Sequence, residues 1–365
     1  MTLQLPAPGD RVVVAMSGGV DSSVAAALLH ERGCEVIGIT LSLYEDPDGV
    51  EGGCCTPEDV TDARRVCADL GVRHYVLNYK DAFERAVVKP FVDFYRRGLT
   101  PNPCAQCNNI LKFDRLLRRT RELDARWLAT GHYARILRGD DGELRLARAQ
   151  DAAKDQSYFL YGVQRSALPF ITFPLGDHRK EEARDDARRL GVRTSDKPDS
   201  QDVCFIPDGR TAEFVRKHGG AAEPGPIVDD SGRRLGSHQG LHAFTVGQRR
   251  GVGVASTHPL YVLRLEPESH TLVVGSPDKL DASVVQAEGW NWLREPALGE
   301  SLAVKVRYRS PPAPVAALKS KEESVRISLA TPVRAVAPGQ AVVLYGGDHM
   351  DEVLGGGTIG ATTEN

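Results

Sequence analysis

The chain has 365 residues, more than one hydrophobic core usually holds, and this length predicts two or three domains. Its formal net charge of -3 gives no general attraction for nucleic acid, so any RNA-binding surface has to be local. The N-terminus lacks the basic and apolar regions of a secretory signal, and no apolar run approaches the ~20 residues that span a membrane. The 7 cysteines are an odd number and all precede residue 205, which favours a reducing cytoplasm over a secreted disulfide scaffold.

The most informative stretch is a loop of small residues between a predicted buried strand, Arg11–Ala15, and a helix predicted over 24–32. The loop and helix start comprise Met16, Ser17, Gly18, Gly19, Val20, Asp21, Ser22 and Ser23. Small residues let backbone N–H groups approach a ligand, and a helix N-terminus adds positive potential, so the string predicts a phosphate site. It is not the P-loop that places Lys after Gly. It resembles the pyrophosphate loop of ATP pyrophosphatases, although a bare Gly-Gly would indicate only a turn.

Three more strands of a parallel sheet are predicted at Glu35–Leu41, His74–Leu77 and Arg126–Thr130, with helices over 57–70 and 81–97. The carboxyl ends of strands in a doubly wound sheet face the nucleotide. Leu41 and Gly131 are therefore candidate neighbours of adenine, and Leu41 is equally typical of plain core. His132 is either a polar site residue or a turn histidine.

Cysteines divide into two groups by their surroundings. Cys107 is predicted at or just before the N-terminus of a helix over 110–122, where the helix dipole favours thiolate. Cys204 lies between apolar residues, which by composition alone indicates a buried inert thiol, and Cys34 and Cys67 are predicted to be core.

A metal or redox site is an alternative for the same cysteines. Cys104 and Cys107 form a Cys-x-x-Cys pair that, with Cys204, suggests a redox pair or part of an Fe–S cluster. A structural zinc site normally has four ligands, and no second Cys-x-x-Cys exists. Cys54 and Cys55 are remote candidates for further ligands.

The amino-acid composition and the residue pattern change beyond Phe205. Gly and Pro become dense over 221–253, and short alternating runs then follow at close spacing, which predicts a small antiparallel barrel. We expect three domains: a nucleotide-binding catalytic domain at 1–215, a small central domain at 216–275 and a barrel at 276–365. A hairpin is predicted over 133–150, and Lys154–Tyr158 is typical of a solvated helix start.

Taken together, these strings resemble the bacterial tRNA-specific 2-thiouridylases. The matching strings run nearly end to end: 15–23, 100–103, 107–108, 130–133, 154–157, 199–200, 203–206, 246–249, 306–309 and 338–340. The resemblance implies an α/β chain with a Rossmann-like adenine nucleotide alpha-hydrolase (PP-loop) domain, a small central α+β domain and a C-terminal antiparallel β-barrel that contacts tRNA. It implies a cytoplasmic enzyme, with no membrane partner, that replaces O2 of the wobble uridine with sulfur.

The resemblance also implies the reaction and its residues. ATP, with Mg²⁺, adenylates uridine O2, and sulfur then reaches C2 from a persulfide on Cys204, with Cys107 as nucleophile and a transient Cys107–Cys204 disulfide. ATP contacts are expected from Ala15, Met16, Ser17, Gly18, Gly19, Val20, Asp21, Ser22, Leu41 and Gly131. The target base is expected at Asn102, Pro103 and Cys104, and tRNA at His132, Lys154, Asp155, Gln156, Arg307, Tyr308 and Gln340.

One departure and two alternatives remain. Many family members have Asp where this chain has Cys104, which leaves the acid/base group open, because a thiol has an ordinary pKa of ~8.5. The resemblance further implies two partners: tRNAs of the Lys, Glu and Gln type, and a sulfur donor that is either a cysteine desulfurase or a relay protein. A different ATP pyrophosphatase acting on a small molecule would need neither Cys107 nor Cys204, and a noncatalytic RNA-binding protein would need no intact loop.

Overall fold

The computed structural model describes residues 2–44, 56–195, 197, 203–206, 209–219 and 223–360. The chain forms two compact units. The first contains Met1–Val87, Cys104–Gly209 and Asp351–Val353, and the second contains Val88–Pro103, Arg210–Met350 and Leu354–Asn365. None of the helices in these described ranges is both long and apolar enough to cross a membrane.

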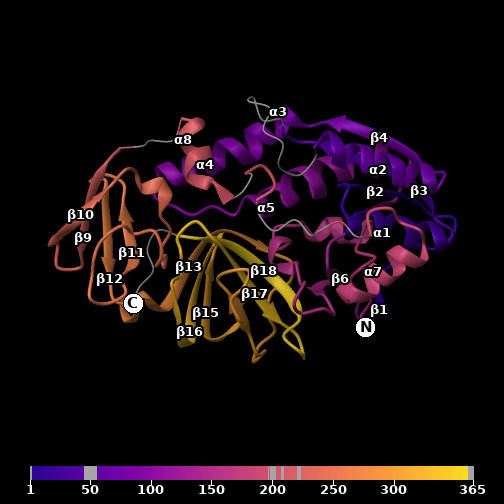
Figure 1. Cartoon of the computed structure of the whole chain (residues 1–365). Helices are drawn as coiled ribbons and strands as arrows, with labels where there is room; N and C mark the ends of the chain where they lie inside the picture. The colour runs from indigo at the N-terminus through magenta and orange to yellow at the C-terminus, as the bar shows by residue number, and fades with distance from the viewer. Residues whose placement is uncertain are drawn as a thin grey trace. The chain divides into compact units, whose positions relative to one another are not determined.

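A five-stranded parallel sheet lies at the centre of the first unit, in the order β4-β3-β2-β5-β8, of which Figure 1 labels β2, β3 and β4. Its strands are β2 (Arg11–Ala15), β3 (Glu35–Ser42), β4 (Arg73–Asn78), β5 (Trp127–Thr130) and β8 (Ile171–Thr172). Val12, Val13 and Val14 are fully buried, because a parallel sheet has both faces covered and its central strands are apolar throughout. The four strands predicted from sequence are confirmed.

Three helices pack on one face of this sheet: α1 (Val20–Glu31), α2 (Pro57–Asp69) and α7 (Lys180–Arg189). Their apolar residues form one core with Val12 and Val14, which alternate onto that face. The start of α2 follows from its sequence, since Thr56 and Asp59 cap each other reciprocally and Pro57 occupies the first turn.

Six helical segments connect β4 to β5 along the chain. They are α3 (Lys80–Phe83), the π-helical η1 (Glu84–Val88), α4 (Lys89–Arg96), α5 (Pro103–Gln106), the π-helical η2 (Cys107–Leu116) and α6 (Leu117–Glu122). π-Helical turns are rare in proteins and concentrate at functional sites, so η2, which begins at Cys107, is notable.

The predicted hairpin is confirmed as β6 (Ala134–Arg138) and β7 (Leu144–Arg148), which pair with β1 (Thr2–Leu3) and with Glu352. Two 3₁₀ turns follow, η3 (Ser157–Phe159) and η4 (Arg165–Phe170). Lys154–Tyr158 is not a solvated helix start, because Asp155, Ser157 and Tyr158 are buried.

The second unit contains α8 (Thr211–Lys217) and a four-stranded sheet in the order β10-β9-β12-β11. Its strands are β9 (Gly225–Asp229), β10 (Arg234–His238), β11 (Tyr261–Glu266) and β12 (Thr271–Gly275), with 3₁₀ turns η6 (Leu241–Ala243) and η7 (Pro277–Leu280). The β9–β12 pair is parallel, which the local sequence pattern does not predict.

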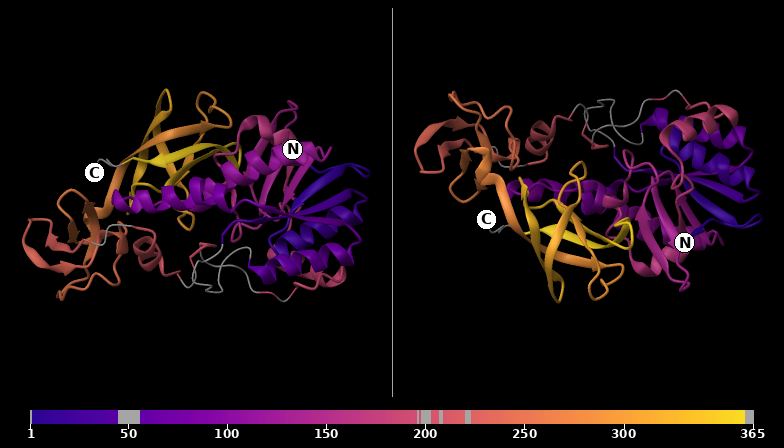
Figure 2. Two further views of the ribbon diagram at one scale, coloured as in Figure 1. Left: turned by 90° about the horizontal axis from the view of Figure 1, so that it is seen from above. Right: turned by 90° about the horizontal axis from the view of Figure 1, so that it is seen from below.

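Six strands close into the predicted barrel, in the order β18-β13-β16-β15-β14-β17 with β18 also paired to β17 (orange to yellow in Figure 2). They are β13 (Asp281–Trp292), β14 (Ala303–Lys305), β15 (Ala313–Lys321), β16 (Ser324–Arg334), β17 (Ala341–Gly346) and β18 (Glu352–Ile359). Valine-rich alternation fills the interior, and closure leaves no unpaired edge. The three domain boundaries proposed from sequence stay a prediction.

Candidate active site

The loop between β2 and α1 has the backbone of an anion site. Gly18 has φ +75°, a left-handed value that suits glycine, and a Cβ there would overlap the backbone carbonyl of Asp59. The backbone N–H of Ser17 donates to Ser22 Oγ at 3.1 Å, which folds the loop over the helix start. Among the residues that the structure describes, no side chain caps the N-terminus of α1, which leaves its first N–H groups suited to an anion.

Lys180 supplies a cation to this loop that sequence reasoning missed. Its Nζ lies 2.7 Å from Asp21 Oδ1, and the hydroxyl of Tyr133 donates to the same oxygen at 3.0 Å. Lys180 is the first residue of α7 and is buried. A cation at a helix N-terminus is repelled by the positive end of the helix dipole. This unfavourable placement was the signal in the sequence that could have identified Lys180.

Lys197 is the second missed cation. Its Nζ lies 2.8 Å from both Asp59 Oδ1 and Asp62 Oδ2 on α2, and it donates to the Gly18 carbonyl at 3.2 Å. Burial opposes its charge, but Asp59 and Asp62 outweigh burial and raise the pKa of Lys197 above its ordinary value. No pattern in the sequence joins Lys197 to the loop.

Gly131 and His132 follow β5 on the other side of the loop. A Cβ on Gly131 would lie 2.6 Å from the carbonyl carbon of Asp21, so the strand end touches the start of α1. His132 Nδ1 is 2.7 Å from Thr130 Oγ1, and its ring packs against Phe113 and Phe173. Burial, and then the charge of Lys112, lower the pKa of His132 well below its ordinary value. His132 is therefore neutral at pH 7. Leu41 is buried in β3.

The helix that carries Cys104 and Cys107 begins earlier than predicted, at Pro103. The prediction that Cys107 lies at or just before the N-terminus is wrong, because Pro103 fits the first helical turn and starts the helix four residues earlier. Cys104 occupies that first turn, and Cys107 begins the π-helical segment η2. Cys107 is buried, whereas Cys104 is half-buried.

Cys204 belongs to the same unit and is half-buried, so it is more accessible than its composition suggested. The next residue, Phe205, is buried and packs edge-on against Phe83 with ring centroids 5.3 Å apart. That contact anchors the segment that carries the thiol. Cys34 and Cys67 are buried as predicted, and burial raises the pKa of Cys67 to about 11.

The expected metal alternative gains no support from geometry. In the described ranges, which leave out 45–55, no three His, Cys, Asp or Glu side chains gather as a metal site. Cys54 and Cys55 lie outside those ranges.

Several residues expected to contact tRNA have internal partners. Asp155 is buried and accepts hydrogen bonds from Arg148 Nε and from the N–H groups of Ala149 and Ser157. Gln156 Oε1 accepts from the N–H of Tyr133 at 3.0 Å. These contacts hold the end of the hairpin and thereby position the chain beside Lys154.

In the second unit, Gln340 and Arg307 also bond to backbone. Gln340 Nε2 donates to the carbonyls of Thr100 and Pro101, at 3.2 and 3.1 Å, and so supports the loop that leads into Asn102 and Pro103. Arg307 donates to the Val246 carbonyl at 2.8 Å. Tyr308 lies under Lys305 Nζ, 5.7 Å from its ring centroid.

The loop, the parallel sheet and the closed barrel define a nucleotide-binding protein with two accessory parts. Three family models match in order: a tRNA methyl transferase HUP domain at 10–208, a tRNA methyl transferase PRC-barrel domain at 212–276 and an aminomethyltransferase beta-barrel domain at 283–359.

Relatives with curated names identify the family within this class of nucleotide-binding proteins. The chain is 48% identical over 362 residues to the tRNA-specific 2-thiouridylase MnmA of Maricaulis maris, covering 98% of this chain and 89% of that one. It is 49% identical to the protein of the same name from Rhodospirillum rubrum, covering 99% and 98%, and 43% identical to that of Halothermothrix orenii, covering 96% and 99%. The chain belongs to the tRNA-specific 2-thiouridylase family.

Proposed function

We propose that this chain catalyses ATP-dependent 2-thiolation of the wobble uridine of tRNA. The observation that carries the proposal is that one compact unit holds both the lysine-flanked phosphate loop and the two cysteines, Cys107 and Cys204. A small-molecule ATP pyrophosphatase needs the first feature only. By family resemblance the substrates are tRNAs of the Lys, Glu and Gln type in the cytoplasm.

Activation begins with ATP on the loop. Uridine O2 is a poor leaving group, so O2 attacks the α-phosphorus, pyrophosphate departs, and the base carries AMP at O2. The open N-terminus of α1 and the glycine backbone fit the phosphates, and Leu41 and Gly131 are the proposed adenine neighbours. The two lysines hold the loop between them.

The charges around the loop also favour a divalent cation. Asp21, Asp59 and Asp62 carry one more charge than Lys180 and Lys197 together. A polyphosphate entering a site with net negative charge is repelled unless a cation comes with it. Carboxylate oxygen suits Mg²⁺, and Asp21 in the first turn of α1 is the carboxylate that directly follows the loop. Bound Mg²⁺ would neutralise the charge of the departing pyrophosphate.

Sulfur transfer uses the two thiols. A donor protein, a cysteine desulfurase or a relay protein, leaves a persulfide on Cys204. The thiolate of Cys107 attacks the Cys204 sulfur, a Cys107–Cys204 disulfide forms and hydrosulfide is released. Hydrosulfide adds to C2, and AMP leaves with O2. The two electrons that reduce the sulfane sulfur come from the thiols, so an external reductant must reset the disulfide. Direct attack of the persulfide on C2 is the variant of this scheme.

Recognition of tRNA is the remaining part of the proposal. The target base leaves its stack to meet Asn102, Pro103 and Cys104, and Gln340 supports this loop from the barrel side of the same unit. Lys154 and Arg307 supply cations, and Tyr308 supplies a ring. Neutral His132 would act as a hydrogen-bonding group and not as a cation. Asp155 and Gln156 would act by positioning Lys154.

The test is nucleoside mass spectrometry of tRNA after incubation with ATP and a sulfur source. Cys107→Ser and Cys204→Ser should each abolish 2-thiouridine while AMP formation on tRNA persists, because adenylation needs no thiol. Cys34→Ala, which removes a core thiol, is the matched control and should retain thiolation. Cys104→Asp should retain activity as well. If either serine variant thiolates tRNA with a persulfide donor, the requirement for two thiols is refuted.

The same samples test the cluster alternative. If wild-type protein purified without oxygen carries iron and Cys104→Asp is dead, a cluster held by Cys104, Cys107 and Cys204 replaces the persulfide scheme. AMP formation that does not depend on tRNA would instead point to a small-molecule substrate.

A further inference from the structure

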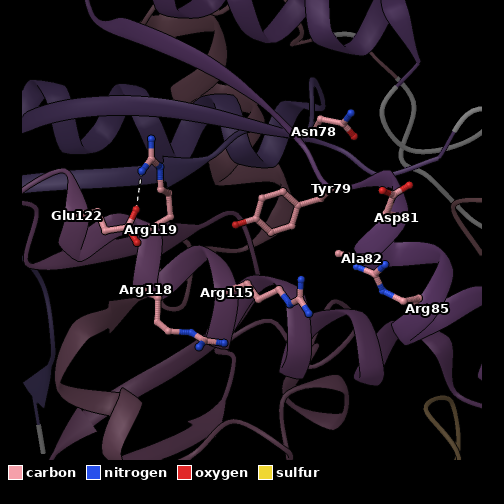
Figure 3. A pocket seen from close by; sticks show the side chains of 9 residues that line it. All are labelled: Asn78, Tyr79, Asp81, Ala82, Arg85, Arg115, Arg118, Arg119 and Glu122. Carbon is pink, nitrogen blue, oxygen red and sulfur yellow. Dashed lines mark hydrogen bonds and ion pairs between the residues drawn. The ribbon is translucent and has the colours of Figure 1, made fainter.

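A basic hollow of about 650 Å³, open to solvent, lies in the first unit beyond the end of β4. Figure 3 shows its lining side chains. One wall carries Tyr79 and Arg85 from the segment β4–η1, and the other carries Arg115, Arg118 and Arg119 from η2 and α6. None of these residues belongs to the loop or to the thiol pair.

Two of the four arginines lack a counter-charge. Arg118 pairs with Asp114 at 2.6 Å, and Arg119 pairs with Glu122. The side chains of Arg85 and Arg115 are exposed, and no ion pair or side-chain hydrogen bond joins either guanidinium to a residue in the described ranges. The acids that face the hollow are Asp81 and Glu122, and Glu122 already bonds Arg119, so the hollow keeps an excess of positive charge.

The spacing of the arginines gathers them on one side of the helical stretch. Arg115, Arg118 and Arg119 stand at i, i+3 and i+4, so their side chains are neighbours on its surface. Tyr79 lines the other wall of the hollow. Burial raises the pKa of Tyr79 in spite of the nearby arginines, so its hydroxyl keeps its proton and can donate to an anion.

The position of the hollow relates it to the proposed chemistry. Asn78 ends β4 at the carboxyl edge of the parallel sheet, the edge at which β2 meets the phosphate loop. Two strand spacings separate β4 from β2, which is about 10 Å. The π-helical segment η2, which carries Arg115, begins with Cys107, on the order of 10 Å along the axis from Arg115.

We propose that this hollow binds phosphates of the single-stranded RNA that flanks the reacting uridine. The identity of the RNA rests on the proposed function. Unpaired guanidiniums with a hydroxyl donor match phosphodiester oxygens, and a cationic groove with an aromatic residue is the usual platform for a single strand. An acidic protein partner would need an apolar centre, and apart from half-buried Tyr79 the hollow has no exposed apolar side chain.

The experiment measures binding of a tRNA transcript with a wobble uridine to the full chain over a range of salt concentrations. Arg85→Ala/Arg115→Ala should bind at least tenfold more weakly, and the slope of log K against log salt should be shallower by about 1.4–1.8, as two lost phosphate contacts require. Arg115→Lys should keep most of the slope. Arg121→Ala is the control on the same helix, outside the hollow, and should bind as wild type.

Thermal unfolding of each variant shows whether it is folded. If the double variant does not fold, the salt dependence of tRNA binding by Arg115→Lys is the measurement that remains. A double variant that is folded and keeps wild-type affinity and slope overturns the proposal. So does a variant that binds tRNA normally but fails to accept sulfur from a donor protein, since the hollow would then serve an acidic protein. Thiolation by the wild type is measured in parallel: its absence refutes the proposed function alone, whereas normal thiolation with an unchanged slope refutes the hollow alone.

Discussion

Replacing Lys197 with methionine tests the ionic frame of the phosphate loop. The substitution keeps the length of the apolar stem and removes an ammonium group that touches Asp59, Asp62 and the Gly18 carbonyl. The side chain of Lys197 is 30% exposed and those of its partners 16% and 20%, so the pairs lie between surface and buried cases. We expect a loss of about 1–2 kcal/mol in the free energy of unfolding.

The effect on ATP follows from the charge left behind. For a phosphate charge bound about 8 Å from the ammonium group, loss of that positive charge costs roughly 0.5–2 kcal/mol at effective permittivities between 80 and 20. The KM for ATP in AMP formation should therefore rise about two- to thirtyfold. The triple variant Lys197→Met/Asp59→Asn/Asp62→Asn removes the stranded carboxylates and should regain part of the affinity.

The control comes from the same part of the chain. Arg193 pairs with Asp69 on α2, but its side chain is 67% exposed, so Arg193→Met should change neither stability nor KM measurably. The assay is release of AMP from labelled ATP with tRNA at saturation. A KM for ATP in the Lys197→Met protein within twofold of wild type would refute the role given to this lysine.

Three further outcomes are expected. Gly131→Ala places a Cβ 2.6 Å from backbone atoms at the start of α1 and should lower the urea midpoint of unfolding. Gly19→Ala is the control, because its Cβ would meet nothing nearer than 3.5 Å, and it should lower the midpoint far less. Equal midpoints for the two variants would contradict the close contact at Gly131. The depressed pKa of His132 means that the unfolded chain binds a proton that the folded chain does not bind. The stability that neutral His132 contributes is therefore fully present above pH 6.5, and the free energy of unfolding falls below pH 6.5 by up to ~1.4 kcal/mol per pH unit. Urea unfolding at pH 7, 6 and 5 should show a flatter pH dependence for His132→Asn than for the wild type. Native alkylation at pH 8 should label Cys204 and spare Cys67, whose pKa is about 11, until the protein unfolds; early labelling of Cys67 would contradict its burial.

Local sequence signals were sufficient for four of the five strands of the parallel sheet, for the start of α2 and for the barrel. Unbroken runs such as Val12–Val14 predicted buried parallel strands, and Thr56 with Pro57 predicted the start of α2 to the residue. Alternation with turns at close spacing predicted the barrel strands. In each case the signal and the structure it specifies lie within a few residues of each other.

What the sequence could not supply depends on distance along the chain. Lys180 and Lys197 reach the loop across more than a hundred residues, and no local pattern records which acid each meets. The helix start at Pro103 was misplaced because Thr100–Pro103 has two prolines, which indicate a loop as readily as a first turn. The basic hollow was missed because its arginines come from η1 and from η2 with α6, two segments that α4 and α5 separate along the chain.

Closure of the barrel by β18 has a consequence for synthesis of the protein. The last strand of the parallel sheet, β8, ends at Thr172, whereas β18 ends at Ile359. At ribosomal rates of ~5–20 residues per second, the two are separated by on the order of 10–40 s. Late in that interval β13, which ends at Trp292, and β17, which ends at Gly346, are made, and each then has an unpaired edge until β18 follows. A message that ends before codon 350 would leave those edges open permanently, and its product should be found in aggregates or on chaperones.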